Sequence, residues 1–476
     1  MSGDIYLAEL PADLAWVNLD DALPLASLRG KVVLLNFWCG SSIACEQQAQ
    51  EIRQLEVKFH DGIVVLAIHT PKHPAEAEDA QVLKTANRWH LRHPVANDRE
   101  WLLWRQLGIE VWPSVALIDP DGKLVGIYAG EGRRVELEDR IQALLDQAAE
   151  ADRRSFDVAP TGRKPEPRAP LRFPTRLAAS ASHLYVADTG YNRVLELSFE
   201  GRINRQFGSG NPGNWDARGT EAGFRDPVGL AIWKDYLFIA DSGNHSIRRV
   251  RLMSGDVETL AGNGVCERPQ GTDFSQPKTV PLATPLDLAV LNDRLYIAVA
   301  GLHQIWQLDL GRDVLSLYAG NGREDAVDGS GSFSSFSQPS GIAIGNDSLY
   351  VADASSSALR QLRLYDGRVQ TLIPGGLFAD GAQDGAAGAG RMCHPTAVHA
   401  DLARGVLWIA DTLNHKLRVY AIAKNELKTL NVNYKLHGPA GVCVAQQAVW
   451  IANTDAHEIL KLDLKSGRLA RLPISS

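Results

Sequence analysis

The sequence of 476 residues predicts two structural classes in one chain, an α/β domain followed by an all-β propeller of six blades. Residues 30–150 alternate apolar strand-like runs with helical patterns, whereas residues 173–476 repeat one short strand motif six times. A segment rich in proline and arginine separates these two patterns. We therefore expect domains at residues 1–150 and 173–476, joined by a linker at residues 151–172.

In the first domain, the expected elements follow one another as they do in a parallel sheet. Residues 31–38 and 62–68 read as buried strands with a helix between them at residues 43–59. Helical patterns at residues 80–89 and 101–107 precede an apolar strand at residues 114–118. Asp119-Pro-Asp-Gly122 predicts a hairpin turn into a strand at residues 123–128, and a helix at residues 137–149 closes the domain. The result is an α/β sandwich with an antiparallel edge.

The linker has no apolar period. It combines four prolines with five basic residues, namely Arg153, Arg154, Arg163, Lys164 and Arg168. A solvated tether is the favoured interpretation, and contact with a polyanion is the alternative.

The second domain contains six copies of one motif. Each copy begins with a proline, at positions 174, 227, 285, 339, 395 and 439. A strand typified by Leu184-Tyr-Val-Ala-Asp188 follows in each copy. One copy holds about four short strands, which are too few to bury both faces, and radial stacking of such sheets solves this problem. The sequence therefore predicts a six-bladed β-propeller.

Polar residues recur at fixed places of the repeat. The histidines are His245, His303, His415 and His457, and the aspartates that end the strand motif are Asp188, Asp241, Asp353 and Asp411. A zinc site needs ligands within about 2.1 Å of one ion, whereas these histidines lie in four separate blades. We interpret the histidines as structural and expect no metal. We expect the aspartates to accept backbone N–H groups at turns, and Val299 at the equivalent place argues against a shared catalytic role.

Composition excludes several classes of protein. The net charge is −7 and no long basic run occurs, which argues against nucleic acid as the main partner. The first residues lack the basic start and apolar core of a signal peptide, and no apolar run reaches membrane-spanning length. Five scattered cysteines form no C-x-x-C pair, so neither a disulfide framework nor a structural zinc site is expected. These features favour a cytoplasmic protein that binds neither nucleic acid nor membrane.

Several motifs resemble known families. Asn244-His245 and Asn414-His415, each after an Asp-x-x turn, resemble NHL repeats. Residues 30–38, Trp112-Pro113-Ser114 and Asp119-Pro-Asp-Gly122 resemble a thioredoxin-like domain of the thiol-disulfide family. In this order, the two halves resemble the NHL repeat-containing protein 2 family and its bacterial relatives. The resemblance implies a thioredoxin-like fold before an NHL propeller, with a cis peptide bond between Trp112 and Pro113.

The same resemblance places the active-site loop at residues 38–45. Thiol–disulfide exchange uses two cysteines two residues apart, one to attack the disulfide and one to resolve the intermediate. Aligning Trp38 with the family's tryptophan places Ser42 at the attacking position and Cys45 at the resolving position. The proton-shuttling acid of thioredoxins falls on Asn36. A hydroxyl cannot take part in the exchange, so we expect no ordinary dithiol reductase activity.

Three interpretations of Cys45 are open. In the favoured one, Ser42 is a helix N-cap and Cys45 is a small, half-buried apolar residue. In the second, Cys39 forms a disulfide with Cys45, which its expected place at the strand end disfavours because the Cα atoms must lie within about 6.8 Å. In the third, Ser42-Ile-Ala-Cys45 is similar to the Thr-x-x-Cys of peroxiredoxins, although Trp38 stands where that motif has its proline.

The leading functional hypothesis is a cytoplasmic scaffold that is non-catalytic or weakly redox-active and uses no cofactor. A cleft framed by Trp38, Ser42 and Pro113 is expected to bind an extended peptide, and the propeller a protein. One alternative is a thiol-dependent oxidoreductase or peroxidase that uses Cys45, assisted by Cys39. The other is a metal-dependent hydrolase or lyase of the propeller.

The longest insertions of the propeller, at residues 208–226, 262–283, 320–338 and 375–394, suggest where a partner docks. They follow the outermost strand in four successive repeats, so we expect them on one face, walled by blades one to four and open toward blades five and six. Their aromatic side chains are candidate anchors, with pinning of their own loops as the alternative: Trp215, Phe274, Phe333, Phe336 and Phe378.

Overall fold

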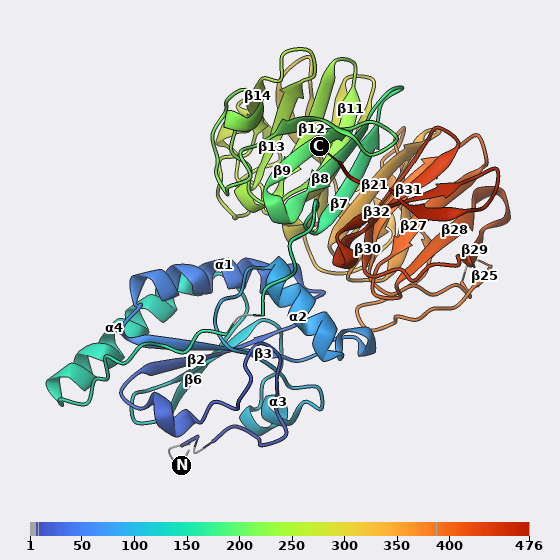
Figure 1. The fold of residues 1–476 in the computed structure, drawn as a ribbon. Helices are drawn as coiled ribbons and strands as arrows, with labels where there is room; N and C mark the ends of the chain where they lie inside the picture. Colours follow the sequence, from blue (N-terminus) through green and yellow to red (C-terminus); the bar gives the residue numbers. More distant parts are fainter. Residues whose placement is uncertain (1–5, 8, 163, 387, 476) are drawn as a thin grey trace. The chain divides into compact units, whose positions relative to one another are not determined.

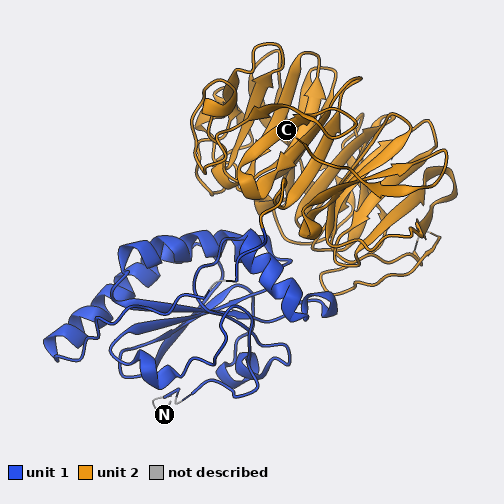
Figure 2. Ribbon diagram, viewed as in Figure 1, with its two compact units in different colours: residues 1–167 blue, residues 168–476 orange. Residues whose placement is uncertain are grey.

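The computed structural model describes residues 6–475 apart from 8, 163 and 387. The residues before Tyr6, on which part of the export expectation rests, and the linker residue Arg163 lie outside the described residues. The chain divides into two compact units, Met1–Pro167 and Arg168–Ser476 (Figure 2). Among the described residues, no helix is both long enough and apolar enough to cross a membrane.

The first unit is built on one six-stranded sheet with the strand order β1-β4-β3-β2-β5-β6. Its strands are β1 (Ala15–Trp16), β2 (Val32–Trp38), β3 (Ile63–His69), β4 (Val95–Asn97), β5 (Ser114–Ile118) and β6 (Leu124–Ala129). Its helices are α1 (Ile43–Lys58), α2 (Asp79–Arg88), α3 (Leu102–Leu107) and α4 (Arg134–Glu150). β2 pairs in parallel with β3 and antiparallel with β5, which confirms the α/β sandwich with an antiparallel edge. The sequence patterns did not reveal β1 and β4.

Alternate residues of β2 build two cores, one on each face of the sheet. Val32 and Leu34 pack with Ile52 of α1 and Ile141 of α4 on one face. Val33, Leu35 and Phe37 pack with residues of α3, including Leu103 and Trp104, on the other. Because both faces are covered, β2 is apolar at nearly every position, and its carboxyl end delivers the chain directly to the loop before α1.

The second unit is a six-bladed β-propeller, as predicted (Figure 1). Each blade is a sheet of four consecutive strands. Blade one holds β7 (Pro174–Ala179), β8 (Leu184–Asp188), β9 (Arg193–Leu197) and β10 (Ile203–Phe207), and blade two holds β11 (Pro227–Trp233), β12 (Tyr236–Asp241), β13 (Ser246–Arg251) and β14 (Val257–Ala261). Blade three holds β16 (Pro285–Leu291), β17 (Arg294–Val299), β18 (Gln304–Asp309) and β19 (Val314–Ala319), and blade four holds β21 (Pro339–Gly345), β22 (Ser348–Asp353), β23 (Ala358–Arg363) and β24 (Arg368–Ile373). Blade five holds β26 (Pro395–Asp401), β27 (Val406–Asp411), β28 (Lys416–Ala421) and β29 (Glu426–Thr429), and blade six holds β30 (Pro439–Ala445), β31 (Ala448–Asn453), β32 (Glu458–Asp463) and β33 (Leu469–Arg471).

The first strand of each blade contacts the first strands of its neighbours, and β7 contacts both β11 and β30, so the ring is closed. Residues near the end of blade six also bond to blade one, because Ile203 of blade one donates its N–H to the carbonyl of Ser475 at 2.8 Å. The apolar strands therefore face neighbouring blades and are committed to the core.

Each long insertion reaches the outer edge of the blade that follows it. Three of them contain two-residue strands, β15 (Asp273–Phe274), β20 (Gly329–Ser330) and β25 (Gly385–Ala386), which pair with the outermost strand of the following blade. In the fourth, Arg218 bridges to Asp256 at the edge of blade two. The insertions thus cover the outer edges of blades two to five, because each unpaired edge strand offers hydrogen-bonding groups that a passing loop can satisfy.

Candidate functional site

The loop between β2 and α1 begins the helix as predicted. Ser42 has an extended backbone at the N-cap position of α1, and its Oγ accepts the backbone N–H of Cys45 at 3.4 Å. A serine side chain in this place satisfies one of the amide groups that a helix leaves unpaired at its start. The hydroxyl at the attacking position therefore stabilises the helix.

Cys45 is more deeply buried than the sequence suggested, with 1% of its surface exposed. It lies in a cluster with Trp38, Cys39, Ala49 and Val82. The favoured interpretation of Cys45 expected a half-buried residue, but packing of α1 against the sheet closes the remaining side. No thiol of this loop reaches the surface, among the residues described.

Cys39 also is fully buried, and the structure brings it to Cys45. Burial and a hydrogen bond with the Cys45 thiol raise the pKa of the Cys39 thiol well above its ordinary value. Both cysteines are in the free thiol form. The turn at Gly40 and Ser41 separates the strand end from the first helical turn, and both cysteine side chains pack into one cluster.

A buried glutamate that the sequence analysis did not single out lies beside this pair. Glu76, 2% exposed, accepts hydrogen bonds at Oε2 from the Ser41 hydroxyl at 3.1 Å and from the backbone N–H groups of Lys72 and His73. Ser41 Oγ lies 3.9 Å from the sulfur of Cys39. In the sequence, Pro74 followed by Glu76 could have drawn attention to this glutamate, because the pattern favours the start of a short helix.

Asn36, at the position of the thioredoxin acid, is engaged elsewhere. Its Oδ1 accepts a hydrogen bond of 2.6 Å from the Gln48 side chain of α1. The amide pair ties β2 to α1 and leaves Glu76 as the carboxylate near the thiols.

The Trp112–Pro113 peptide bond is cis, which confirms the prediction. Pro113 is buried, and its carbonyl accepts the N–H of Gly130 at 2.8 Å. Trp112 is partly exposed and packs against the cluster that contains both cysteines. Its indole N–H donates to the carbonyl of Thr70 at 3.1 Å.

Trp38 does not frame a cleft, contrary to the hypothesis. Its side chain is 1% exposed, and its ring lies 4.8 Å from that of His69 and 5.1 Å from that of Trp89. Trp38 belongs to the core because it is the last residue of a strand that is covered on both faces. Of the three residues proposed for the cleft, Ser42 alone is partly exposed.

In the propeller, one residue in each blade joins that blade to the next. This residue follows the turn after the second strand of the blade. Six residues in the left-handed region accept the N–H of the residue before the next blade's proline. The acceptors are Asn192, His245, His303, Ser357, His415 and His457, with distances of 2.9 to 3.2 Å. The last of these contacts, from Phe173 to His457, closes the ring. Each histidine accepts through Nδ1, which explains the recurrence without a metal.

The aspartates also act as predicted. Asp188, Asp241, Asp353 and Asp411 each accept the N–H of the residue two positions before the proline of their own blade, at 2.6 to 2.8 Å. Asn453 does the same in blade six. Every blade but the third is thus anchored at its start by its own strand and by the preceding blade.

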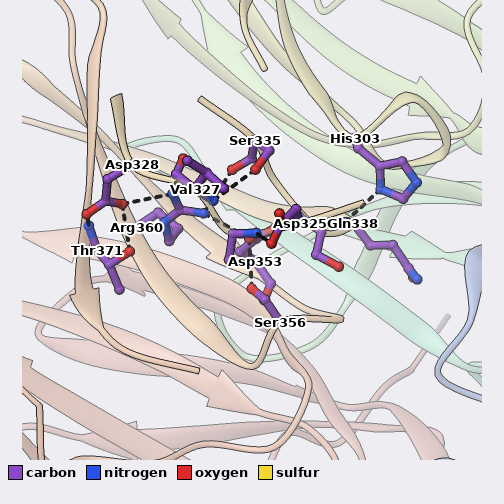
Figure 3. A network of polar contacts seen from close by, with 12 residues as sticks. His303, Asp325, Val327, Asp328, Ser335, Gln338, Asp353, Ser356, Arg360 and Thr371 are labelled. Carbon is purple, nitrogen blue, oxygen red and sulfur yellow. Dashed lines mark hydrogen bonds and ion pairs between the residues drawn. The ribbon is translucent and has the colours of Figure 1, made fainter. Parts of the chain in front are cut away.

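Three of these aspartates belong to a buried clamp that binds the insertion loops (Figure 3). In blade four, Arg360 pairs with Asp353 at 3.3 Å and with Asp328 of the loop at 3.0 Å. It also donates to the carbonyls of Val327 and Ser335. Equivalent clamps are formed by Arg248 with Asp241 and Asp216, and by Arg418 with Asp411 and Asp384. Each loop is therefore fixed by charge-assisted bonds in the interior.

Blade three replaces both members of the clamp. Val299 stands at the aspartate position and Trp306 at the arginine position. Trp306 is buried, stacks on Phe274 of the insertion and donates its indole N–H to Gln304. An apolar pair thus holds this loop where the other three use ions.

The first strands of the blades meet around the buried side chain of one arginine. Arg176 of β7 pairs with Asp287 of β16 at 3.3 Å and donates to the carbonyls of Ser340, Thr396 and Ala440. These residues come from the first strands of five blades. A guanidinium at this point repels metal cations, which argues against the hypothesis of a metal-dependent enzyme in the channel.

The five aromatic residues of the insertions divide into two groups. Phe336 is fully buried, Phe274 stacks on Trp306, and the Trp215 indole donates to the carbonyl of Glu221, so these three pin their own loops. Phe333 and Phe378 are 78% and 71% exposed. Trp215 is also 47% exposed, so three of the five reach the surface, on loops that the arginine clamps hold in place.

The fold defines a class of protein: a thioredoxin-like domain followed by a six-bladed NHL propeller. A family model described as thioredoxin-like matches residues 30–124. NHL repeat-containing protein 2 of Gallus gallus is 31% identical over 99% of this chain and 72% of its own. The chain belongs to the NHL repeat-containing protein 2 family. It is also similar to the chloroplastic protein Suppressor of quenching 1 of Arabidopsis thaliana, with 32% identity over 96% of this chain and 47% of that protein.

Proposed function

We propose that this protein is a cytoplasmic scaffold that binds protein partners and does not catalyse thiol–disulfide exchange. The observation that carries the proposal is Ser42, which caps α1 at the attacking position while Cys45 lies buried below it. Exchange requires a thiolate that can reach a disulfide sulfur, and this loop presents a hydroxyl instead. The domain's surface at Ser42 is then left for binding an extended peptide.

The propeller supports binding through loops that are fixed before a partner arrives. The clamp of Arg360 holds residues 327, 328 and 335 of one insertion, and Phe333 lies exposed between these points. A preorganised loop loses little conformational entropy on binding, and an exposed aromatic ring gives a large contact area. We place the protein-binding surface at this loop and at the loop of Phe378.

Partner capture by the full chain tests this proposal. Phe333→Ala and Phe378→Ala are expected to lower the affinity for a co-purified partner by about tenfold or more, as removal of an aromatic anchor does. Tyr365→Ala is the matched control, because Tyr365 is as exposed as Phe378 and lies in the hairpin turn between β23 and β24. Equal capture by all three variants would remove these loops from the binding surface.

A further inference from the structure

Two thiols lie in contact under the loop that joins β2 to α1. Cys39 and Cys45 pack into one buried cluster, on either side of the turn at Gly40 and Ser41. A disulfide requires sulfurs about 2.05 Å apart, and rotation of two neighbouring buried side chains can bring them to that separation. The pair is therefore placed to lose two hydrogens and form a bond.

Glu76 provides a proton acceptor beside the pair. Its Oε2 is occupied by three donors, whereas its buried Oε1 receives no hydrogen bond from any residue that the structure describes. Oε1 points to the loop, since a Cβ placed on Gly40 would lie 3.2 Å from it. This carboxylate oxygen is therefore an open hydrogen-bond acceptor that faces the loop holding Cys39.

Access to the sulfurs selects the oxidant. Cys39 and Cys45 are 0% and 1% exposed, so a protein disulfide cannot approach either sulfur. Hydrogen peroxide is little larger than water and is itself a two-electron oxidant. Gly40 and Ser42, which are partly exposed, are the loop residues over the pair.

We propose that Cys39 and Cys45 form a peroxide-sensitive dithiol switch in which Glu76 accepts the proton of Cys39. This goes beyond the scaffold function, because it assigns to the same domain a response to a small oxidant that needs no cysteine at position 42.

The chemistry takes two steps. The Cys45 sulfur attacks one oxygen of hydrogen peroxide, the O–O bond breaks, and the products are a sulfenic acid and water. Cys39 then gives its proton to Glu76, and its sulfur attacks the Cys45 sulfur. The S–O bond breaks, and the leaving hydroxide takes the proton from Glu76. Two thiols and one peroxide thus give one disulfide and two waters.

The surroundings of the two cysteines assign these roles. Cys45 lies in the first turn of α1, next to the partly exposed Ser42 and Ala44, so we assign it the attack on peroxide. Cys39 lies outside the helix, and burial raises its pKa, so it keeps its proton until a base removes it.

The test uses the full chain carrying Cys266→Ser, which removes the exposed cysteine. After treatment with hydrogen peroxide, unreacted thiols are alkylated in denaturant and the chain is cut with trypsin. Residues 32–53 contain no Lys or Arg before Arg53, so one peptide carries both cysteines. We expect this peptide to lose two hydrogens, to escape alkylation and to regain both thiols with dithiothreitol. Cys443, buried in the propeller, is the internal control and should stay reduced.

Single variants separate the roles. Cys39→Ser should leave a sulfenic acid at Cys45 that dimedone traps, and Cys45→Ser should leave Cys39 unoxidised. Glu76→Gln should slow disulfide formation about tenfold or more at neutral pH. The difference should shrink at high pH, where hydroxide replaces the carboxylate, whereas a purely structural role would give a difference independent of pH.

Two results would overturn the switch. One is a peptide of residues 32–53 that keeps both thiols under peroxide that oxidises Cys266 in the unmodified chain. The other is overoxidation of Cys45 without a disulfide. An unchanged rate in Glu76→Gln would overturn the role of Glu76, and if that variant fails to fold, the comparison of the parent chain with Cys39→Ser still decides whether the thiols act together.

Discussion

Replacement of Arg360 by methionine tests how much the buried clamp contributes to the propeller. Methionine keeps the length and the apolar stem of the side chain but removes the charge and all its hydrogen-bond donors. Asp353 is then left buried without its cation, and the carbonyls of Val327 and Ser335 lose their donor. The loop at residues 320–338 loses its attachment to the blade.

The magnitude follows from the contacts that disappear. Arg360 makes four hydrogen bonds, to Asp353, Asp328, Val327 and Ser335, all between 3.0 and 3.3 Å. Loss of one member of a buried ion pair costs about 3–5 kcal/mol. Four bonds at about 0.5–1.5 kcal/mol each give a similar sum.

Chemical denaturation followed by far-ultraviolet circular dichroism measures this loss. Arg363→Met is the matched control, because Arg363 lies three residues away on the same strand, is partly exposed and pairs locally with Asp366. We expect it to cost less than about 1 kcal/mol. Hydrogen exchange of residues 320–338 should accelerate in Arg360→Met alone. If both variants lose the same stability, the clamp does not hold the loop and the reasoning is refuted.

Blade three suggests the companion experiment. Because Val299 and Trp306 replace both ions there, the double variant Asp353→Val with Arg360→Met should lose less stability than the sum of the two single variants. We expect a coupling of about 1–3 kcal/mol. Additive losses would mean that the two side chains do not depend on each other.

The remaining predictions concern the histidine contacts and the thioredoxin-like loop. Burial lowers the pKa of His245 to about 4, whereas its ordinary value is 6.5. The neutral imidazole therefore contributes fully to the free energy of unfolding above pH 6.5. As the pH falls from 6.5 toward 4, up to about 3 kcal/mol of that free energy is lost. His245→Asn should flatten this loss, since Asn192 fills the same role in blade one. The protein should show no turnover in a dithiol-driven insulin reduction assay, and Ser42→Cys should create activity that Cys45→Ala abolishes; an inactive Ser42→Cys variant would mean that more than the nucleophile is missing.

Much of the architecture could be predicted from the residues alone. The six prolines and strand motifs determined the blade number, because a repeated strand pattern must place equivalent residues at equivalent points of the fold. The aspartate and histidine roles followed from the same repetition. Ser42 as a helix cap was read from local sequence, where the interactions span a few residues, whereas the cis bond before Pro113 followed from the resemblance to thioredoxin-like domains.

The tertiary structure decided what depends on distant partners. Spacing along the chain placed Cys39 and Cys45 on different elements, but the fold of the loop brought the thiols together. Glu76, from the segment after β3, bonds to Ser41 of the same loop, a contact that no local pattern encodes. Trp38 became core because helices cover both faces of its strand, and the insertions bound the next blade's edge because that edge had unsatisfied hydrogen bonds. Periodicity reports which face of an element is buried, whereas the neighbours on that face are set by the packing of the whole chain.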